Sequence, residues 1–172
     1  MRLLAHNPQL FFDKCLAELK LCSPLPTSPA LKRINRILFE FDFALDPAIR
    51  SMYYSNYEAA TVVVMKKYLK QGDTVIDVGA SIGYLSALAM GFVGKSGEVH
   101  SFEPVPEYCR LLRRIAVANK DYKIFINECA LGDKETRFRI DLTNLPNIGW
   151  NTLVPGYMSG ETTRESFDRR TS

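Results

Sequence analysis

Three short apolar runs recur along the middle of the chain, separated by longer stretches of mixed polarity. The runs read TVIDVGA from Thr74, EVHSFEP from Glu98 and KIFINECAL from Lys123. Runs of this length, rich in Val, Ile and Phe, are typical of strands buried in a parallel sheet. We therefore expect three parallel strands in this region, the second of them stopped by Pro104.

The stretches between these runs repeat their apolar residues at helical spacing. Pro106 stands where the second of the two expected helices would begin, a position that proline favours. Strands that alternate with helices imply right-handed crossovers and a Rossmann-like, doubly wound parallel α/β sheet. The apolar positions are Leu85, Leu88, Ala89 and Phe92 in the first helix, and Leu111, Leu112, Ile115 and Ala116 in the second.

Residues 1–56 form a less regular N-terminal lead. Residues 1–22 place apolar side chains at helical spacing, which predicts an amphipathic helix. Three prolines within residues 23–29 break that helix and indicate a linker. The segment 31–46 is ambiguous, because its isoleucines fit a helix whereas the letters FEFDF alternate as in a strand.

The rest of the chain divides into an α/β domain over residues 57–160 and a polar tail over residues 161–172. Asn56 is placed to cap a helix that starts the α/β domain and ends near Gly72. The letters TRFRIDL near the end of the domain predict a fourth strand, at an edge or in a hairpin-like excursion. Arg164–Arg170 is poor in apolar residues, and we expect it to be either disordered or a cut-off segment rather than a nucleic-acid arm.

Composition excludes a disordered chain, a collagen and a disulfide miniprotein. The chain has 172 residues, of which 47% are hydrophobic and 24% charged, as in a globular domain with a real core. Its net charge of +3 is too small to indicate nucleic-acid binding. No apolar run approaches the roughly 20 residues that span a bilayer. Charged residues such as Asp13, Lys14 and Glu18 interrupt the N-terminus, so we expect no signal peptide.

The four cysteines do not have the spacing of a metal or redox site. Cys15, Cys22, Cys109 and Cys129 form no C-x-x-C pair, and no histidine lies near them at zinc-ligand spacing. We expect reduced thiols, no bound metal and a cytoplasmic location.

The first apolar run ends in a loop that suits a ligand. The loop reads D-V-G-A-S-I-G from Asp77 to Gly83, and its glycines let the backbone approach a ligand beside the free N–H groups of the next helix. Asp77 stands where the dinucleotide fingerprint has its first glycine, and the lysine of a P-loop is missing. The loop therefore favours neither NAD nor ATP. An acid at this point disfavours a pyrophosphate and tolerates a cationic ligand.

Glu103 ends the second apolar run, roughly 20 residues beyond the loop. An acid at this point of an α/β unit can accept hydrogen bonds from both hydroxyls of a ribose. Loop and acid together predict a nucleoside ligand that has no phosphate at the loop and carries positive charge near carboxylates. S-adenosylmethionine matches, because it has a ribose, an adenine, a sulfonium and an amino-acid end.

On these residues the chain resembles the FkbM-type family of class I S-adenosylmethionine-dependent methyltransferases. The similar segments are GDTVIDVGASIGYLS, SGEVHSFEPVPEYCRLLRR and NECALGD, with YEAA upstream, and they span about Tyr57 to Val154. The resemblance implies a class I methyltransferase sheet and O-methylation of a hydroxyl on a small molecule or glycan. Nothing in the chain itself identifies that acceptor, or the oligomeric state.

The resemblance also implies a cofactor site for S-adenosylmethionine. Its methionine part would lie along the glycine loop, where Asp77 would either sit near it or order the loop, and Glu103 would bind the ribose. Most family members carry Asn where Ser81 stands, which keeps a small polar side chain. The implied cofactor-binding residues are Asp77, Gly79, Ala80, Ser81, Gly83, Glu103, Pro104, Cys129 and Ala130.

No catalytic residue can be assigned. The family's K-I-D-x-E-G strand, which supplies acidic residues beside the methyl group, has no counterpart here. The length after Thr74 suits about half of a seven-stranded sheet, so we expect only the N-terminal half of the fold. Two alternatives therefore stay open: a truncated, non-catalytic S-adenosylmethionine-binding remnant and, with less support, a NAD-dependent oxidoreductase.

Overall fold

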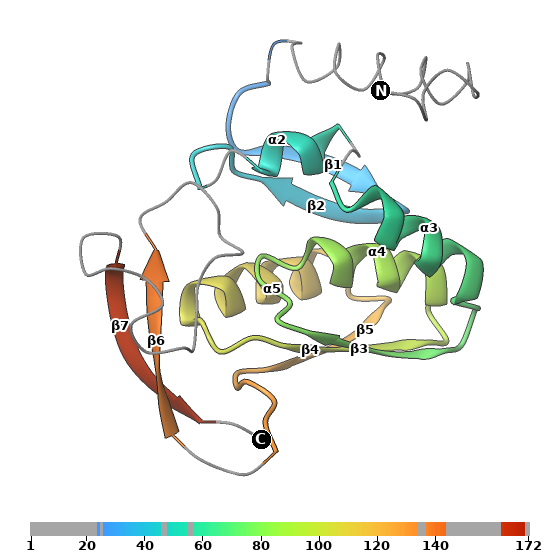
Figure 1. Ribbon diagram of the computed structural model, residues 1–172. Helices are drawn as coiled ribbons and strands as arrows, with labels where there is room; N and C mark the ends of the chain where they lie inside the picture. Colours follow the sequence, from blue (N-terminus) through green and yellow to red (C-terminus); the bar gives the residue numbers. More distant parts are fainter. Residues whose placement is uncertain are drawn as a thin grey trace, which may run out of the picture.

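The structure is a computed structural model that describes residues 24, 26–45, 48–54, 57–133, 137–143 and 163–170. For the last two ranges the description covers the backbone alone. The helix expected over residues 1–22 lies outside the described residues. In the main body a hairpin covers a layer of helices, and the helices cover a parallel sheet (Figure 1).

The parallel sheet contains the three predicted strands. They are β3 (Thr74–Val78), β4 (Glu98–Phe102) and β5 (Lys123–Asn127), hydrogen-bonded in the order β3-β4-β5. Both pairs are parallel. The Rossmann-like parallel sheet predicted from the alternating pattern is therefore confirmed.

Two crossover helices connect these strands and pack on the same face of the sheet (Figure 1). They are α4 (Tyr84–Val93) and α5 (Pro106–Ala118), and both were predicted. Helix α4 is apolar nearly all round and is buried between the sheet and the hairpin, whereas α5 is amphipathic with Leu112 and Ile115 turned inward. Helix α3 (Ala59–Tyr68) packs beside α4.

The opposite face of the sheet carries exposed apolar side chains. Ile76 and Val78 on β3 are 63% and 60% exposed, and Phe125 on β5 is 45% exposed. His100 of β4 lies between Ile76 and Phe125 in the register, and its ring stacks on Phe125 with centroids 4.7 Å apart. The burial expected from the apolar runs thus holds for the face under the helices, and the described helices leave the other face open.

The ambiguous segment 31–46 contains a β-hairpin rather than a helix. Strand β1 (Ala30–Ile34) pairs antiparallel with β2 (Ile37–Phe41). The two residues of the turn, Asn35 and Arg36, have φ angles of 44° and 77°, the left-handed combination of a type I′ turn. The strand pattern of FEFDF was thus the correct reading, and the helical spacing of the isoleucines was misleading.

The hairpin is attached to the helices by polar as well as apolar contacts. The Asn119 side chain at the end of α5 accepts from the Leu38 N–H at 2.8 Å and donates to the Leu38 carbonyl at 2.9 Å. The turn residue Asn35 donates to the Leu88 carbonyl of α4 at 2.9 Å. A short helix α2 (Ala48–Tyr53) follows the hairpin and buries Ile49 and Met52.

The remaining expectations had mixed outcomes. Helix α3 starts at Ala59, and Asn56 lies outside the described residues. The described residues within 23–29 are neither helix nor strand, as expected of a linker.

The fourth strand is β6 (Arg137–Thr143), and it pairs antiparallel with β7 (Thr163–Arg170). The expectation of disorder over Arg164–Arg170 is therefore wrong, because strand pairing uses backbone hydrogen bonds, which a segment of polar residues can also form. No described helix is long and apolar enough to cross a membrane.

Replacing Gly91 by alanine tests the close contact between hairpin and helix. A β-carbon on Gly91 would collide with the backbone carbonyl and side chain of Asn35. We expect Gly91→Ala to lower the free energy of unfolding by about 1–3 kcal/mol, although alanine normally favours a helix over glycine. Urea unfolding measures the effect. The control Val117→Ala, on the exposed side of α5, should change stability by less than about 0.5 kcal/mol.

Candidate functional site

The glycine loop is held at the carboxyl end of the sheet by the neighbouring strand. The N–H groups of Gly79 and Ala80 both donate to the carbonyl of Phe102, the last residue of β4, at 2.9 and 3.1 Å. Gly83 then closes a turn by donating to the Ala80 carbonyl at 2.8 Å, and α4 begins at the next residue. The loop therefore lies where ligands of parallel α/β sheets bind.

The two glycines of the loop have different tasks. Gly79 has a φ of 77°, and a β-carbon placed there would meet nothing within 4 Å, so its backbone faces open space. Gly83 has a φ of 85°, but a β-carbon there would lie 2.6 Å from Leu112 and 2.7 Å from Ile115 of α5. Gly79 thus leaves room for a ligand, whereas Gly83 is needed for close packing of the loop on α5.

Asp77 supplies the cap that α4 does not have. The residue before the helix, Gly83, has no side chain with which to cap it. The Asp77 carboxylate instead accepts the hydroxyl of Ser86 at 2.5 Å and also bonds the backbone of Ser86, the third residue of α4. Burial raises the pKa of Asp77, and these hydrogen bonds from Ser86 act in the opposite direction.

An acid in this position affects which ligands the loop can bind. In nucleotide-binding folds the free N–H groups and positive dipole end of the helix attract a phosphate. Here the Asp77 carboxylate already takes the place of that anion. The resemblance left two roles for Asp77, either lying near the methionine part of the cofactor or ordering the loop. The contacts of Asp77 with Ser86 support the second role.

Glu103 connects the loop to the end of β4. Its Oε2 accepts from the Ser81 N–H at 2.7 Å and its Oε1 from the Val105 N–H at 2.8 Å. The residue is only 4% exposed. Burial, followed by the nearby charge of Asp77, raises the pKa of Glu103, while the two backbone hydrogen bonds lower it. Each oxygen keeps a second lone pair, so a ribose hydroxyl would share an oxygen with a backbone amide.

The remaining predicted residues lie at the same edge of the sheet. The Glu103 N–H donates to the Asn127 carbonyl at 3.0 Å, which brings the end of β5 beside the end of β4. Cys129, two residues further on, is a partly exposed free thiol, and Ala130 is buried. Pro104 follows Glu103 directly and is half-buried. The structure thus places Asp77 near the carboxyl end of β3 and the other eight predicted residues in the segments that follow β3, β4 and β5.

The sequence did not point to Ser86, Ser101 or Val105. Ser101 is fully buried and its hydroxyl lies 2.7 Å from that of Ser86. A signal for it was present, because Ser101 interrupts the apolar positions of β4 on the face that turns toward the helices. Val105 contributes only its backbone N–H, which a sequence pattern cannot identify.

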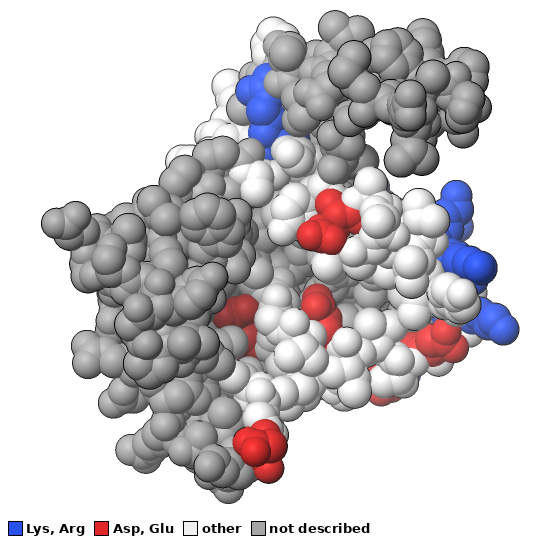
Figure 2. Space-filling model, viewed as in Figure 1, with Lys and Arg blue, Asp and Glu red and all other residues white. Residues whose placement is uncertain are grey.

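Charge is distributed unevenly over this side of the molecule. Figure 2 shows the described Lys and Arg side chains at its margins, while acidic side chains also lie near its middle, where the surface is hollowed. Such a surface is better suited to a ligand with positive charge than to a phosphate ester.

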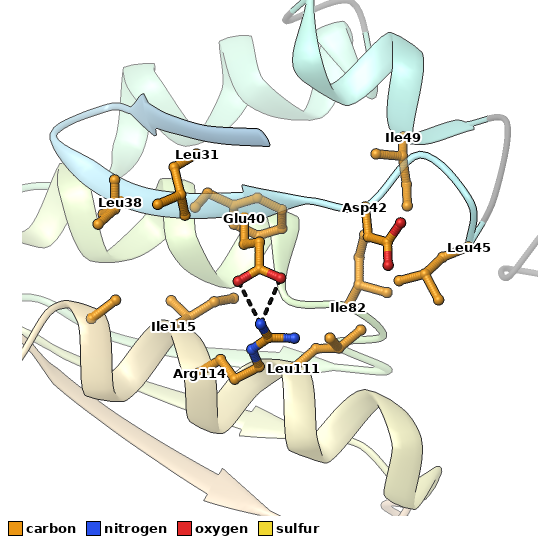
Figure 3. A pocket seen from close by; sticks show the side chains of 12 residues that line it. Leu31, Leu38, Glu40, Asp42, Leu45, Ile49, Ile82, Leu111, Arg114 and Ile115 are labelled. Carbon is orange, nitrogen blue, oxygen red and sulfur yellow. Dashed lines mark hydrogen bonds and ion pairs between the residues drawn. The ribbon is translucent and has the colours of Figure 1, made fainter. Parts of the chain in front are cut away.

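A second hollow lies on the helix side of the loop, between the hairpin and α5 (Figure 3). Its walls are mostly apolar, with Asp42 and an ion pair as the polar groups. In the ion pair, Arg114 Nη2 lies 2.7 Å from both carboxylate oxygens of Glu40. Ile82 is the only member of the glycine loop that lines it. This hollow is therefore separate from the carboxyl edge, where the predicted residues gather. Within the described part of the chain, no group of three or more His, Cys, Asp or Glu residues could hold a metal.

Fold and loop together define a Rossmann-like α/β protein whose candidate ligand edge has Asp77 bonded to the first turn of α4, where a phosphate would otherwise bind. The family model of the methyltransferase FkbM domain matches residues 77–168, slightly more than half of the chain. The chain therefore belongs to the FkbM methyltransferase family, as the sequence resemblance indicated.

Individual relatives match shorter parts. A protein-L-isoaspartate O-methyltransferase 2 from Archaeoglobus fulgidus is 44% identical over 50 residues, which cover 29% of this chain and 23% of that protein. A protein-L-isoaspartate O-methyltransferase from Methanococcus aeolicus is 32% identical over 71 residues, which cover 39% and 32% of the two chains. The chain thus spans a third or less of these relatives. The solved structure of methyltransferase FkbM from Methylobacillus flagellatus shares 19% identity, with a TM-score of 0.35, over 53% of this chain and 29% of that one.

The residues present fit the cofactor of this family, S-adenosylmethionine. The backbone at Gly79 faces open space. The hydroxyl of Ser81 is buried and has no hydrogen-bond partner among the described residues, so a polar group of a ligand can satisfy it. Two carboxylates border the loop, and the helix end that would attract a phosphate is already capped.

The pH dependence of stability tests the environment of Asp77. A folded-state pKa above the unfolded value means that the folded protein holds this proton more tightly. Protonated Asp77 thus contributes its full share of the free energy of unfolding below its unfolded pKa. That contribution is lost as pH rises through the raised pKa of the folded state. We expect the stability of wild type relative to Asp77→Asn to fall with rising pH across that window. Urea unfolding at a series of pH values measures it, and a constant difference would contradict the assignment.

Proposed function

We propose that this chain binds S-adenosylmethionine and forms the cofactor-binding part of a methyltransferase that acts on a hydroxyl of a small molecule or glycan. The observation that carries the proposal is the glycine loop, which is bordered by two carboxylates and whose following helix is already capped by Asp77. This arrangement suits a nucleoside with a sulfonium charge and no phosphate.

Three groups of residues would hold the parts of the cofactor. The backbone of Gly79 and Ala80, with the hydroxyl of Ser81, would contact the methionine part. Glu103 would accept the ribose hydroxyls, and its burial makes these hydrogen bonds strong. Pro104, Cys129 and Ala130, which follow β4 and β5, would border the adenine. Gly83 supports the site from behind through its contact with α5.

The chemistry consists mainly of positioning. When bound, the cofactor would supply a methyl group on a positively charged sulfur. The acceptor oxygen would form a bond to the methyl carbon as the carbon–sulfur bond breaks in line, and S-adenosylhomocysteine would leave. The residues of this chain fix the cofactor and exclude alternative orientations, since alignment of the two reactants lowers the barrier. A general base would take the proton of the hydroxyl, and we assign that role to none of the described residues.

Two alternatives compete with this function. A protein that binds the cofactor without transferring its methyl group would have the same loop. A NAD-dependent oxidoreductase is disfavoured, because Asp77 occupies the helix end that would receive the pyrophosphate. We propose the cytoplasm as the location, since the cofactor is an intracellular metabolite.

Calorimetric titration separates these functions. We expect heat of binding with S-adenosylmethionine and S-adenosylhomocysteine and none with NAD, because only NAD carries a pyrophosphate. A radiolabelled methyl-transfer assay on a panel of hydroxyl compounds then distinguishes an enzyme from a binding protein. Binding of NAD in preference to the other two ligands would overturn the proposal.

Variants of Glu103 test the ribose assignment. Glu103→Ala leaves the N–H groups of Ser81 and Val105 without a partner, so we expect it to abolish cofactor binding and to lower stability by about 1–3 kcal/mol. Glu103→Gln keeps one acceptor for the two backbone N–H groups and sets an amide donor against the other, so it removes less than Glu103→Ala. We expect it to fold but to bind at least tenfold more weakly (a loss of about 1.4 kcal/mol). Glu98→Gln, at the other end of the same strand, is the control. Unchanged affinity in a folded Glu103→Gln protein would refute the assignment.

A further inference from the structure

Two buried serine hydroxyls stand in line behind Asp77. The hydroxyl of Ser86 lies 2.5 Å from Asp77 Oδ2 and 2.7 Å from the hydroxyl of Ser101. Both serines are fully buried. The three residues come from three elements that meet below the glycine loop, namely β3, α4 and β4. The chain of hydrogen bonds therefore joins β3 and β4, the first two strands of the parallel sheet, to the first turn of α4.

The direction of these hydrogen bonds follows from the charge of Asp77. An ionised carboxylate can only accept, so Ser86 donates its single hydroxyl proton to Asp77. The oxygen of Ser86 is then left to accept the proton of Ser101. If Asp77 takes up a proton, it can donate instead, and this order is no longer imposed. The ordered arrangement thus depends on the ionised form of Asp77.

The groups that face Asp77 support its ionised form only through hydrogen bonds. From α4 it meets the hydroxyl and backbone of Ser86, and from β4 the residue beside it in the register is Ser101. The charged group that interacts with Asp77 is Glu103, which carries the same sign. No cation contributes to the shift of the Asp77 pKa, and the hydrogen bond from the Ser86 hydroxyl lowers it. Removing that hydroxyl would therefore raise the Asp77 pKa further.

We propose that Ser86 is a positioning residue for the cofactor loop, with Ser101 as its support. By holding the Asp77 carboxylate against the first turn of α4, Ser86 keeps residues 79–81 in the conformation that accepts the ligand. The inference rests on the proposed function, because the ligand is S-adenosylmethionine. It adds that the pH range over which the cofactor binds is set by two residues that do not touch the cofactor.

The test is the pH profile of cofactor binding. The dissociation constant for S-adenosylmethionine is measured by calorimetry at a series of pH values from neutral pH down through the raised pKa of Asp77. Ser86→Ala should bind about tenfold more weakly at neutral pH, as expected for a lost hydrogen bond to a charged group. Its loss of affinity toward acid should also begin at a higher pH than in wild type.

Three further variants make the result specific. Ser86→Ala added to Asp77→Asn should leave the pH profile of Asp77→Asn unchanged, because the titrating group is gone. Ser101→Ala should shift the profile in the same direction as Ser86→Ala but less, since Ser86 still reaches Asp77. Ser96→Ala removes an exposed hydroxyl in the turn after α4 and should match wild type.

The outcomes separate this inference from the proposed function. If wild type does not bind S-adenosylmethionine, the proposed function fails. If wild type binds and folded Ser86→Ala has the affinity and pH profile of Ser96→Ala, the positioning role is refuted. Thermal unfolding reports whether each variant folds. Should Ser86→Ala not fold, Ser101→Ala decides, and a Ser101→Ala profile equal to wild type overturns the proposal.

Discussion

The carbonyl oxygen of Phe102 is the point on which the loop depends. It accepts the N–H groups of Gly79 and Ala80 and so ends the pairing of β3 and β4 by turning the chain across the sheet. This turn places α4 directly above the strands and brings Ser81 within hydrogen-bond distance of Glu103. Because the left-handed conformation of Gly79 makes the turn possible, one backbone geometry determines both the layer order and the candidate site.

The site combines the buried carboxylate of Glu103 with the partly buried carboxylate of Asp77, without a cation among the interactions that shift their pKa values. Such an arrangement costs stability, because burial disfavours the charged form of both acids. Backbone amides and serine hydroxyls offset part of that cost. A cationic ligand would offset more of it, which gives a physical reason why a fold would keep two acids at an edge that elsewhere binds phosphates.

The sequence predicted the parts of the fold that follow from periodicity. Strands β3 to β5 come from short, nearly continuous apolar runs, and helices α4 and α5 have apolar residues at helical spacing. The hairpin was ambiguous because Asn35 and Arg36 form its turn without a glycine. Strand β7 was missed because its polar letters carry no burial signal. At the site, the residue types of Asp77 and Glu103 were informative, but the different tasks of Gly79 and Gly83 depend on α5, which is distant in sequence.

The open face of the sheet affects how the protein responds to heat and denaturant. Ile76 and Val78 are already more than half exposed in the folded state and Phe125 is 45% exposed, so unfolding hydrates less additional apolar surface at these residues than in a sheet covered on both sides. The heat capacity of unfolding and the denaturant m-value both scale with newly exposed surface. Per described residue both quantities are therefore smaller than in a fully covered α/β domain, and the stability curve is correspondingly flatter with temperature.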